Sequence, residues 1–134
     1  MNEATLRTIL CELSRAFEAR DLEGLLTSFS RSPTATYSGS EGGETATGAG
    51  ALRPLFARLL RREATYSFDL PHLTYGGTHE LVWMFGDGRG VEIRPGHADQ
   101  VFPYRITGAL VREDARWRWA LLAGSEPTAP AADS

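Results

Sequence analysis

The chain has 134 residues, of which 42% are hydrophobic and 23% are charged. This composition predicts one globular domain that is large enough for a core, and it excludes a disordered or fibrous chain. The 14 basic and 17 acidic residues, with a formal net charge of −3, are mixed along the chain and form no basic stretch that would predict nucleic-acid binding.

The cellular compartment is predicted from three further features. No apolar run approaches the roughly 20 residues that a membrane span needs. The first residues lack the charged and then apolar pattern of a signal peptide. Cys11 is the single cysteine, which excludes an internal disulfide and suits a reducing compartment. We therefore expect a cytoplasmic protein that does not enter a membrane.

Three helices are expected in the first half of the chain. Apolar residues recur at steps of three and four over residues 4–19, with Asn2 as a candidate N-cap. Asp21 is positioned to cap a second, short helix. A third helix runs to about Arg62 and should not begin much before Gly50, because Pro54 is tolerated only near a first turn.

The remaining segments are predicted to be strands and loops. Residues 34–38 resemble a short strand, and residues 39–50 contain five glycines and are expected to form a loop. Further strands are predicted at 65–75, 79–86, about 89–94, 100–112 and 116–124. Gly76-Gly77 and Gly86-Asp87-Gly88 are expected to be turns. Helices followed by a meander of strands indicate an α+β fold.

Two of these strands are apolar on both faces, namely residues 81–85 and 119–123. A one-sided antiparallel sheet normally alternates apolar and polar residues. One face of each strand should meet the helices, and the chain is too short to supply a second helical layer for the other face. We therefore expect a homodimer that is held through the outer face of the sheet.

The terminal hairpin and the residues that follow it, 104–127, carry a family resemblance. SnoaL-like proteins of the nuclear transport factor 2-like superfamily show roughly Arg-x-Thr, a turn, Trp, and then His-x-Ser-x-Pro. The matching positions here hold Arg105, Thr107, Trp117, Ser125 and Pro127. The histidine position holds Ala123, so a reaction that depends on that imidazole cannot run here in the same way.

This resemblance implies a cone: a curved, mixed or antiparallel sheet that is closed by the three N-terminal helices. It implies one domain over residues 1–127, with a flexible tail at 128–134. The scaffold serves cyclases, isomerases, hydrolases and binding modules, so the fold does not identify a reaction. We expect a pocket inside the cone for a small apolar or carbonyl-bearing organic molecule. The protein is then either a cofactor-free isomerase, cyclase or epoxide-hydrolase-type enzyme, or a non-catalytic dimeric binding module.

Three polar residues are candidates for chemistry. Arg105 lies in a predicted strand. If its side chain points into the cone, it would hold a carboxylate, enolate or phosphate. The alternative is an ion pair with Asp99, Glu92 or Asp69. Asp99 precedes the same strand, and an Asp–Arg pair resembles part of the epoxide-hydrolase branch; a surface turn acid is the alternative. His72 follows Pro71 and would act as a general base if it faced the cavity; the favoured alternative is a solvated or hydrogen-bonded histidine.

Aromatic and hydroxyl side chains are candidates for binding the ligand. The candidates for the pocket wall are Tyr37, Trp83, Tyr104, Trp119 and Ser125. The aromatic residues fit ordinary core packing as well. The three histidines lack ligand spacing, which argues against a metal site. Ser125 lacks a matched base and a nucleophile elbow, so nucleophilic catalysis is not expected.

Overall fold

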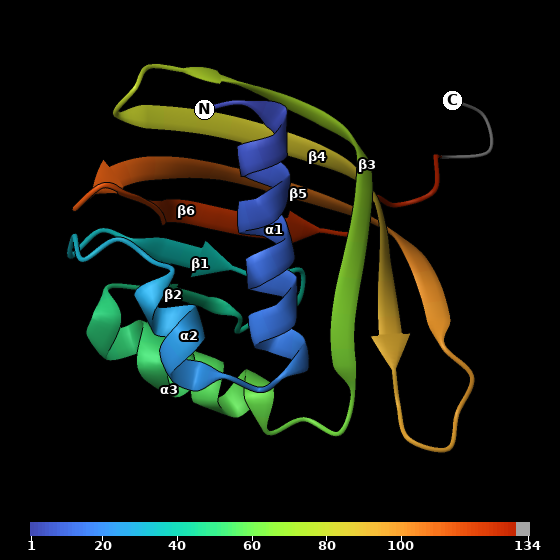
Figure 1. Ribbon diagram of the computed structural model, residues 1–134. Helices are drawn as coiled ribbons and strands as arrows, with labels where there is room; N and C mark the ends of the chain where they lie inside the picture. The colour runs from blue at the N-terminus through green and yellow to red at the C-terminus, as the bar shows by residue number, and fades with distance from the viewer. Residues whose placement is uncertain (131–134) are drawn as a thin grey trace.

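A computed structural model, which describes residues 1–130, contains three helices and one six-stranded sheet (Figure 1). The helices are α1 (Glu3–Glu18), α2 (Leu22–Thr27) and α3 (Ala49–Leu60). The strands are β1 (Thr36–Ser38), β2 (Thr45–Thr47), β3 (Thr65–Gly77), β4 (Leu81–Ile93), β5 (Gln100–Glu113) and β6 (Arg116–Ser125). Their order in the sheet is β2-β1-β6-β5-β4-β3. The β1–β6 pair is parallel, and the other neighbours are antiparallel.

The first two helices begin at the predicted caps. The Asn2 side chain accepts a hydrogen bond from the Thr5 backbone N–H at 2.8 Å. The Asp21 side chain accepts one from the Gly24 N–H at 3.0 Å. Each cap satisfies a backbone donor that the helix itself leaves unpaired. The apolar stripe of α1 then buries Leu6, Leu10 and Leu13 against the sheet.

The glycine-rich segment differs from the expectation of an unbroken loop. Thr45–Thr47 forms β2, which pairs with β1 at the edge of the sheet. Hydroxyl groups across the pair hold this register, since Thr36 and Thr47 lie 2.9 Å apart and Ser38 and Thr45 lie 2.8 Å apart. Threonine and serine pairs of this kind stabilise neighbouring strands. The high glycine content of the segment had predicted a loop, and the prediction did not take these pairs into account.

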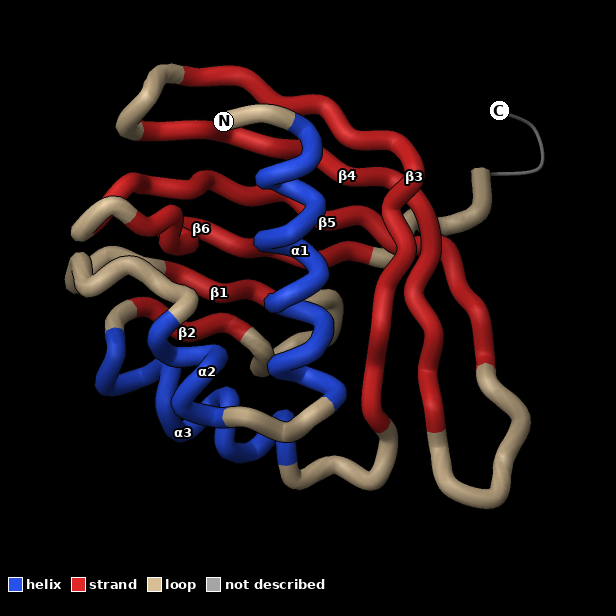
Figure 2. The backbone as a smooth tube through the Cα atoms, in the orientation of Figure 1, coloured by secondary structure: helices blue, strands red, loops and turns tan. Residues whose placement is uncertain are grey.

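The predicted turn at Gly86-Asp87-Gly88 was wrong, because β4 runs unbroken from Leu81 to Ile93. These glycines permit close packing. A Cβ atom on Gly86 would lie 2.8 Å from the Leu70 side chain, and one on Gly88 would lie 2.1 Å from the Asp69 carbonyl oxygen. The opposite strand, β3, has an irregularity between Asp69 and His72. Here β3 and β4 bend sharply together (Figure 2).

This bending makes the sheet strongly curved but leaves it unclosed, with the N-terminal helices on its concave side (Figures 1 and 2). The expected α+β architecture is thus confirmed. The core lies between the helices and the concave face, where Phe56, Leu110 and Trp119 are at most 1% exposed. Within residues 1–130, no helix is long and apolar enough to span a membrane. Residues 131–134 of the expected tail lie outside the described part of the chain.

The convex face of the sheet is apolar and uncovered in the single chain. In β4, Val82 and Met84 face the core, whereas Leu81, Trp83 and Phe85 are 37–49% exposed. In β6, Leu122 is buried and Leu121 is 40% exposed. The two strands that lack polar alternates therefore do present apolar residues on both faces.

Candidate functional site

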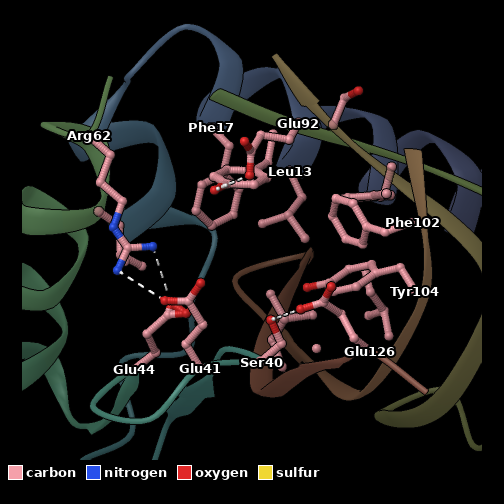
Figure 3. A pocket seen from close by; sticks show the side chains of 18 of the residues that line it. Leu13, Phe17, Ser40, Glu41, Glu44, Arg62, Glu92, Phe102, Tyr104 and Glu126 are labelled. Atoms are coloured by element: carbon pink, nitrogen blue, oxygen red, sulfur yellow. Dashed lines mark hydrogen bonds and ion pairs between the residues drawn. The ribbon is translucent and has the colours of Figure 1, made fainter. Parts of the chain in front are cut away.

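A cavity of about 330 Å³ opens on the concave side of the sheet (Figure 3). It is bounded by α1, the end of α3, the segment between β1 and β2, and the inner faces of β3 to β6. Buried residues such as Leu13, Tyr37 and Ile106 form its depth. The exposed residues Ser40 and Glu126 lie at its mouth. The volume falls in the range of small-molecule pockets.

Two glycines shape the wall of the cavity on β4 and β6. A Cβ atom on Gly90 would lie 2.4 Å from the Phe102 ring, and one on Gly124 would lie 1.9 Å from the Tyr104 hydroxyl oxygen. The two rings lie flat over strands that lack side chains at these points, and they pack edge to face with centroids 5.8 Å apart. The missing side chains thus give the aromatic rings their place along the cavity.

Tyr37 and Tyr104 bring two hydroxyl groups to the lining of the cavity. Tyr37 is 9% exposed and packs its ring against Phe56, with centroids 5.1 Å apart. Neither hydroxyl has a hydrogen-bond partner within residues 1–130, whereas the Tyr66 hydroxyl donates to Glu92 at 3.0 Å. Both hydroxyls are therefore free to bond a molecule in the cavity.

Burial keeps these two phenols protonated. It raises the pKa of Tyr104 to about 12, with smaller contributions from the negative charges of Glu44 and Glu126. It also raises the pKa of Tyr37 well above its usual value, and the neighbouring Tyr104 and Glu44 add to the increase. At neutral pH each hydroxyl is a hydrogen-bond donor with free lone pairs.

Two glutamates and an arginine form an ionic cluster on the other side of the cavity (Figure 3). The Arg62 guanidinium lies 3.6 Å from Glu44 and 3.8 Å from Glu41. Glu44 is 6% exposed, so its carboxylate depends on this neighbour. Arg20 donates hydrogen bonds to the carbonyl oxygens of Leu60 and Arg62, which fixes the backbone that carries the Arg62 guanidinium.

Two further carboxylates face the cavity. Glu92 accepts a hydrogen bond from Tyr66 and lies 2.8 Å from Nε of Arg94. Glu126, which directly follows β6, accepts a bond of 3.4 Å from Ser40. Within residues 1–130, Glu126 has no cationic side chain within ion-pairing distance. The cavity is thus apolar and aromatic in its walls and acidic around its polar groups.

The predicted catalytic residues lie outside this cavity, and their expected orientation into the cone was wrong. Arg105 is exposed on the convex face, where its Nε lies 3.9 Å from Asp87, a partner that the sequence did not suggest. Asp99 is exposed in the segment between β4 and β5, and His72 is exposed on β3 beside the bend. In β5, the residues that face inward are Tyr104, Ile106 and Gly108, which places Arg105 and Thr107 outward.

The predicted binding residues divide into two groups. Tyr37 and Tyr104 line the cavity. Trp83 is 49% exposed on the convex face, and Ser125 is exposed there opposite Arg105. Trp119 is 1% exposed and fills the core, where a Cβ on Gly108 would lie 2.7 Å from its ring. The structure therefore brings together two of the five.

The histidine position of the family pattern also points away from the cavity. Ala123 pairs with Thr107 on the convex face, while its neighbours Leu122 and Gly124 line the cavity. Replacement of histidine by alanine at this position therefore removes nothing from the cavity wall.

Glu41, Glu44, Glu126 and Arg62 were missed because they lie outside the predicted helices and strands or just beyond their ends. Glu41 and Glu44 belong to the glycine-rich segment, Arg62 follows α3, and Glu126 follows β6. Periodicity carries no information at such positions. No three His, Cys, Asp or Glu side chains within residues 1–130 are grouped to hold a metal ion.

Comparison with known proteins agrees with this architecture. The chain is similar to an NTF2-like protein of unknown function from Pseudomonas putida KT2440, with 16% identity, a TM-score of 0.75, and coverage of 95% of this chain and 87% of that one. It is similar to an NTF2-like superfamily protein from Salmonella enterica serovar Typhimurium LT2, with 11% identity, a TM-score of 0.78, and coverage of 96% and 93%. It is also similar to ActVI-ORFA from Streptomyces coelicolor, with 11% identity, a TM-score of 0.76, and coverage of 92% of this chain and 95% of that one.

Identities of this size establish the fold alone. No curated protein matches the sequence. Residues 6–129 match the SnoaL-like domain, which is nearly the whole chain. The curved sheet and the N-terminal helices agree with this match, which leads to one conclusion: the chain belongs to the SnoaL-like family.

Proposed function

We propose that the cavity binds a small, largely apolar organic molecule and that Tyr37 and Tyr104 donate hydrogen bonds to an oxygen atom of that molecule, such as a carbonyl. The observation that carries this proposal is the pair of unpartnered hydroxyls in a cavity of about 330 Å³. Among the described residues, neither hydroxyl oxygen is enclosed by protein without a partner, so each is accessible from the cavity. A ligand oxygen would take the hydrogen bond that each hydroxyl otherwise makes to solvent.

The same groups support acid–base chemistry without a cofactor. Two protonated phenols would stabilise negative charge that develops on a carbonyl oxygen. Glu44, whose charge raises the pKa of both phenols, is available to accept a proton from the carbon beside the carbonyl. An isomerisation or cyclisation through an enolate fits this arrangement better than epoxide opening by Asp99 and Arg105, since those two residues lie outside the cavity.

The proposal is tested with two probes that differ in one oxygen atom. Binding of 2-acetylnaphthalene and 2-ethylnaphthalene is measured by calorimetry for the wild type and for Tyr104→Phe and Tyr37→Phe. Each substitution should weaken the ketone about fivefold, the value of one neutral hydrogen bond, and leave the hydrocarbon unchanged. Thr107→Val, on the convex face, is the control. Equal binding of the ketone by all four proteins would refute the role of the tyrosines.

A second function, association through the convex face, is supported by a different observation. We propose that this face contacts a second copy of the chain. Trp83, Phe85 and Leu121 are exposed there, and the Asp87–Arg105 pair places both charge signs beside them. A two-fold contact needs a surface that is complementary to itself, and this mixture meets that need.

Sedimentation at micromolar concentration tests the association. We expect the mass of a dimer, and we expect Trp83→Arg to reduce it to a monomer without loss of the fold. A wild-type protein with a monomeric mass would exclude the association. This dimer is compatible with ligand binding, because the cavity lies on the opposite face of the sheet.

The remaining expectations stand as proposals. We propose that residues 1–127 form one domain and that it works in the cytoplasm. The free thiol of Cys11, which is exposed on α1, supports a reducing compartment.

A further inference from the structure

The charges around the cavity are unbalanced. Four glutamates line it, namely Glu41, Glu44, Glu92 and Glu126, and among the described lining residues Arg62 carries the one positive charge. Arg62 is shared by Glu41 and Glu44, and Glu92 is paired with Arg94. Glu126, and the excess charge of the Glu41–Glu44 pair, are left without a cation.

An anionic ligand does not suit this arrangement. It would have to take Arg62 from two carboxylates, one of which is buried, and it would lie close to Glu126. Removing the partner of a buried charge is costly, and like charges at short range repel. The cavity therefore disfavours the carboxylates and phosphates that the predicted orientation of Arg105 had suggested.

Aromatic rings supply the complementary attraction. Phe17, Tyr66, Phe68 and Phe102 line the cavity together with the two unpartnered tyrosines. The face of an aromatic ring carries partial negative charge and attracts an ammonium group within about 6 Å. Phe102 and Tyr104 lie on the same side of the cavity as Glu126 (Figure 3). A carboxylate beside aromatic rings is a favourable site for an organic cation.

Tyr37 is an independent indication that a polar ligand enters the depth of this cavity. It is nine-tenths buried, it lines the cavity, and its hydroxyl has no partner within residues 1–130. The phenol oxygen has lone pairs that accept a hydrogen bond as well as a proton to donate. It therefore suits the polar part of a ligand, whether that part is a carbonyl or an amine.

Resting on the proposed function of the cavity, we infer that its ligand carries a protonated amine, which binds between Glu126 and the rings of Tyr104 and Phe102. The apolar part of the ligand lies against Phe17 and Leu13. The negative charges of Glu44 and Glu126 also act on the Tyr104 hydroxyl, because they contribute to the increase of its pKa.

Three probes of similar size and different charge test the inference: 2-naphthylmethylamine, 2-naphthylmethanol and 2-naphthoate. Calorimetry at pH 7 and low ionic strength should give an affinity for the ammonium about tenfold above that for the alcohol, with the naphthoate weakest. Glu126→Gln should reduce the affinity for the ammonium about fivefold and leave the alcohol unchanged. Unchanged binding of the alcohol also shows that the cavity of the variant is intact.

Glu80→Gln is the matched control, because it removes the same charge from an exposed position between β3 and β4. If both variants lower the affinity for the ammonium equally, the overall charge of the protein is responsible and the inference is refuted. Equal affinities for ammonium and alcohol, or tightest binding of naphthoate, would also refute it and leave the proposed cavity function standing. Binding of none of the three probes would overturn the proposed function and the inference together.

Discussion

Gly124→Ala is a sharp test of the cavity wall, because one methyl group meets one defined atom. The new Cβ would lie 1.9 Å from the Tyr104 hydroxyl oxygen and 2.7 Å from the carbon that carries it. Ordinary contacts begin at about 3.4 Å, so the ring has to move by about 1.5 Å. It cannot move freely toward Phe102, which packs against it and against Gly90.

The expected cost follows from two opposing effects. Overpacking of a well-packed site destabilises by about 1–3 kcal/mol. Replacement of glycine by alanine within a strand recovers about 0.5–1 kcal/mol of backbone entropy. We therefore expect a net loss of about 1–2 kcal/mol in the free energy of unfolding, and weaker binding of 2-acetylnaphthalene because the Tyr104 hydroxyl is displaced.

Urea denaturation, with the same measurement on Gly42→Ala, provides the assay. Gly42 is the matched control, since its added Cβ would meet no atom within 4 Å. Its variant should be as stable as the wild type or slightly more stable. If Gly124→Ala is as stable as Gly42→Ala and binds the ketone as the wild type does, then the Tyr104 ring does not pack over Gly124 in β6, and the reasoning is refuted.

Three further predictions concern stability. In urea denaturation, Trp119→Ala should lower the free energy of unfolding by about 3–5 kcal/mol. Trp117→Ala should lower it by about 1–2 kcal/mol, because Trp117 is only half-buried. A larger loss for Trp117→Ala than for Trp119→Ala would contradict the register of β6. Arg20→Ala should cost about 1–2 kcal/mol, because three carbonyl acceptors at the end of α3 lose their donor, and Arg20→Lys should not restore full stability in a thermal melt. Hydrogen bonding from Ser30 lowers the pKa of Glu113 below its usual value of 4.5, so its stabilisation is present above that value and is lost as the pH falls through the lower folded-state pKa. The difference in unfolding free energy between the wild type and Glu113→Gln should shrink over this acidic range, and a constant difference would exclude the linkage.

Local signals in the sequence were sufficient for the elements that depend on neighbours along the chain. The caps at Asn2 and Asp21 and the stripe of Leu6, Leu10 and Leu13 are local features, and they were predicted correctly. The terminal hairpin was also predicted from its turn and its flanking apolar runs, and it carried the family resemblance that the comparison confirmed.

The face that each strand turns to the cavity was decided by tertiary structure. In β5, Tyr104 and Arg105 are adjacent, and a shift by one residue exchanges their places. The alternation of apolar residues could not resolve this choice, because Pro103 and Ala109 add apolar side chains on the side of Arg105 as well. Packing of Ile106 and Leu110 against the helices fixed the face and turned Arg105 outward.

The polar part of the cavity depends even more on the tertiary fold. Glu44, Arg62 and Glu126 come from three segments that are distant in the sequence and have no periodicity of their own. They line one cavity because the segment before β2, the end of α3 and the end of β6 come together on the concave side of the sheet. The motif of the terminal hairpin thus indicated the family and periodicity indicated the helices, whereas contacts between residues distant in the sequence decided which side chains surround the cavity.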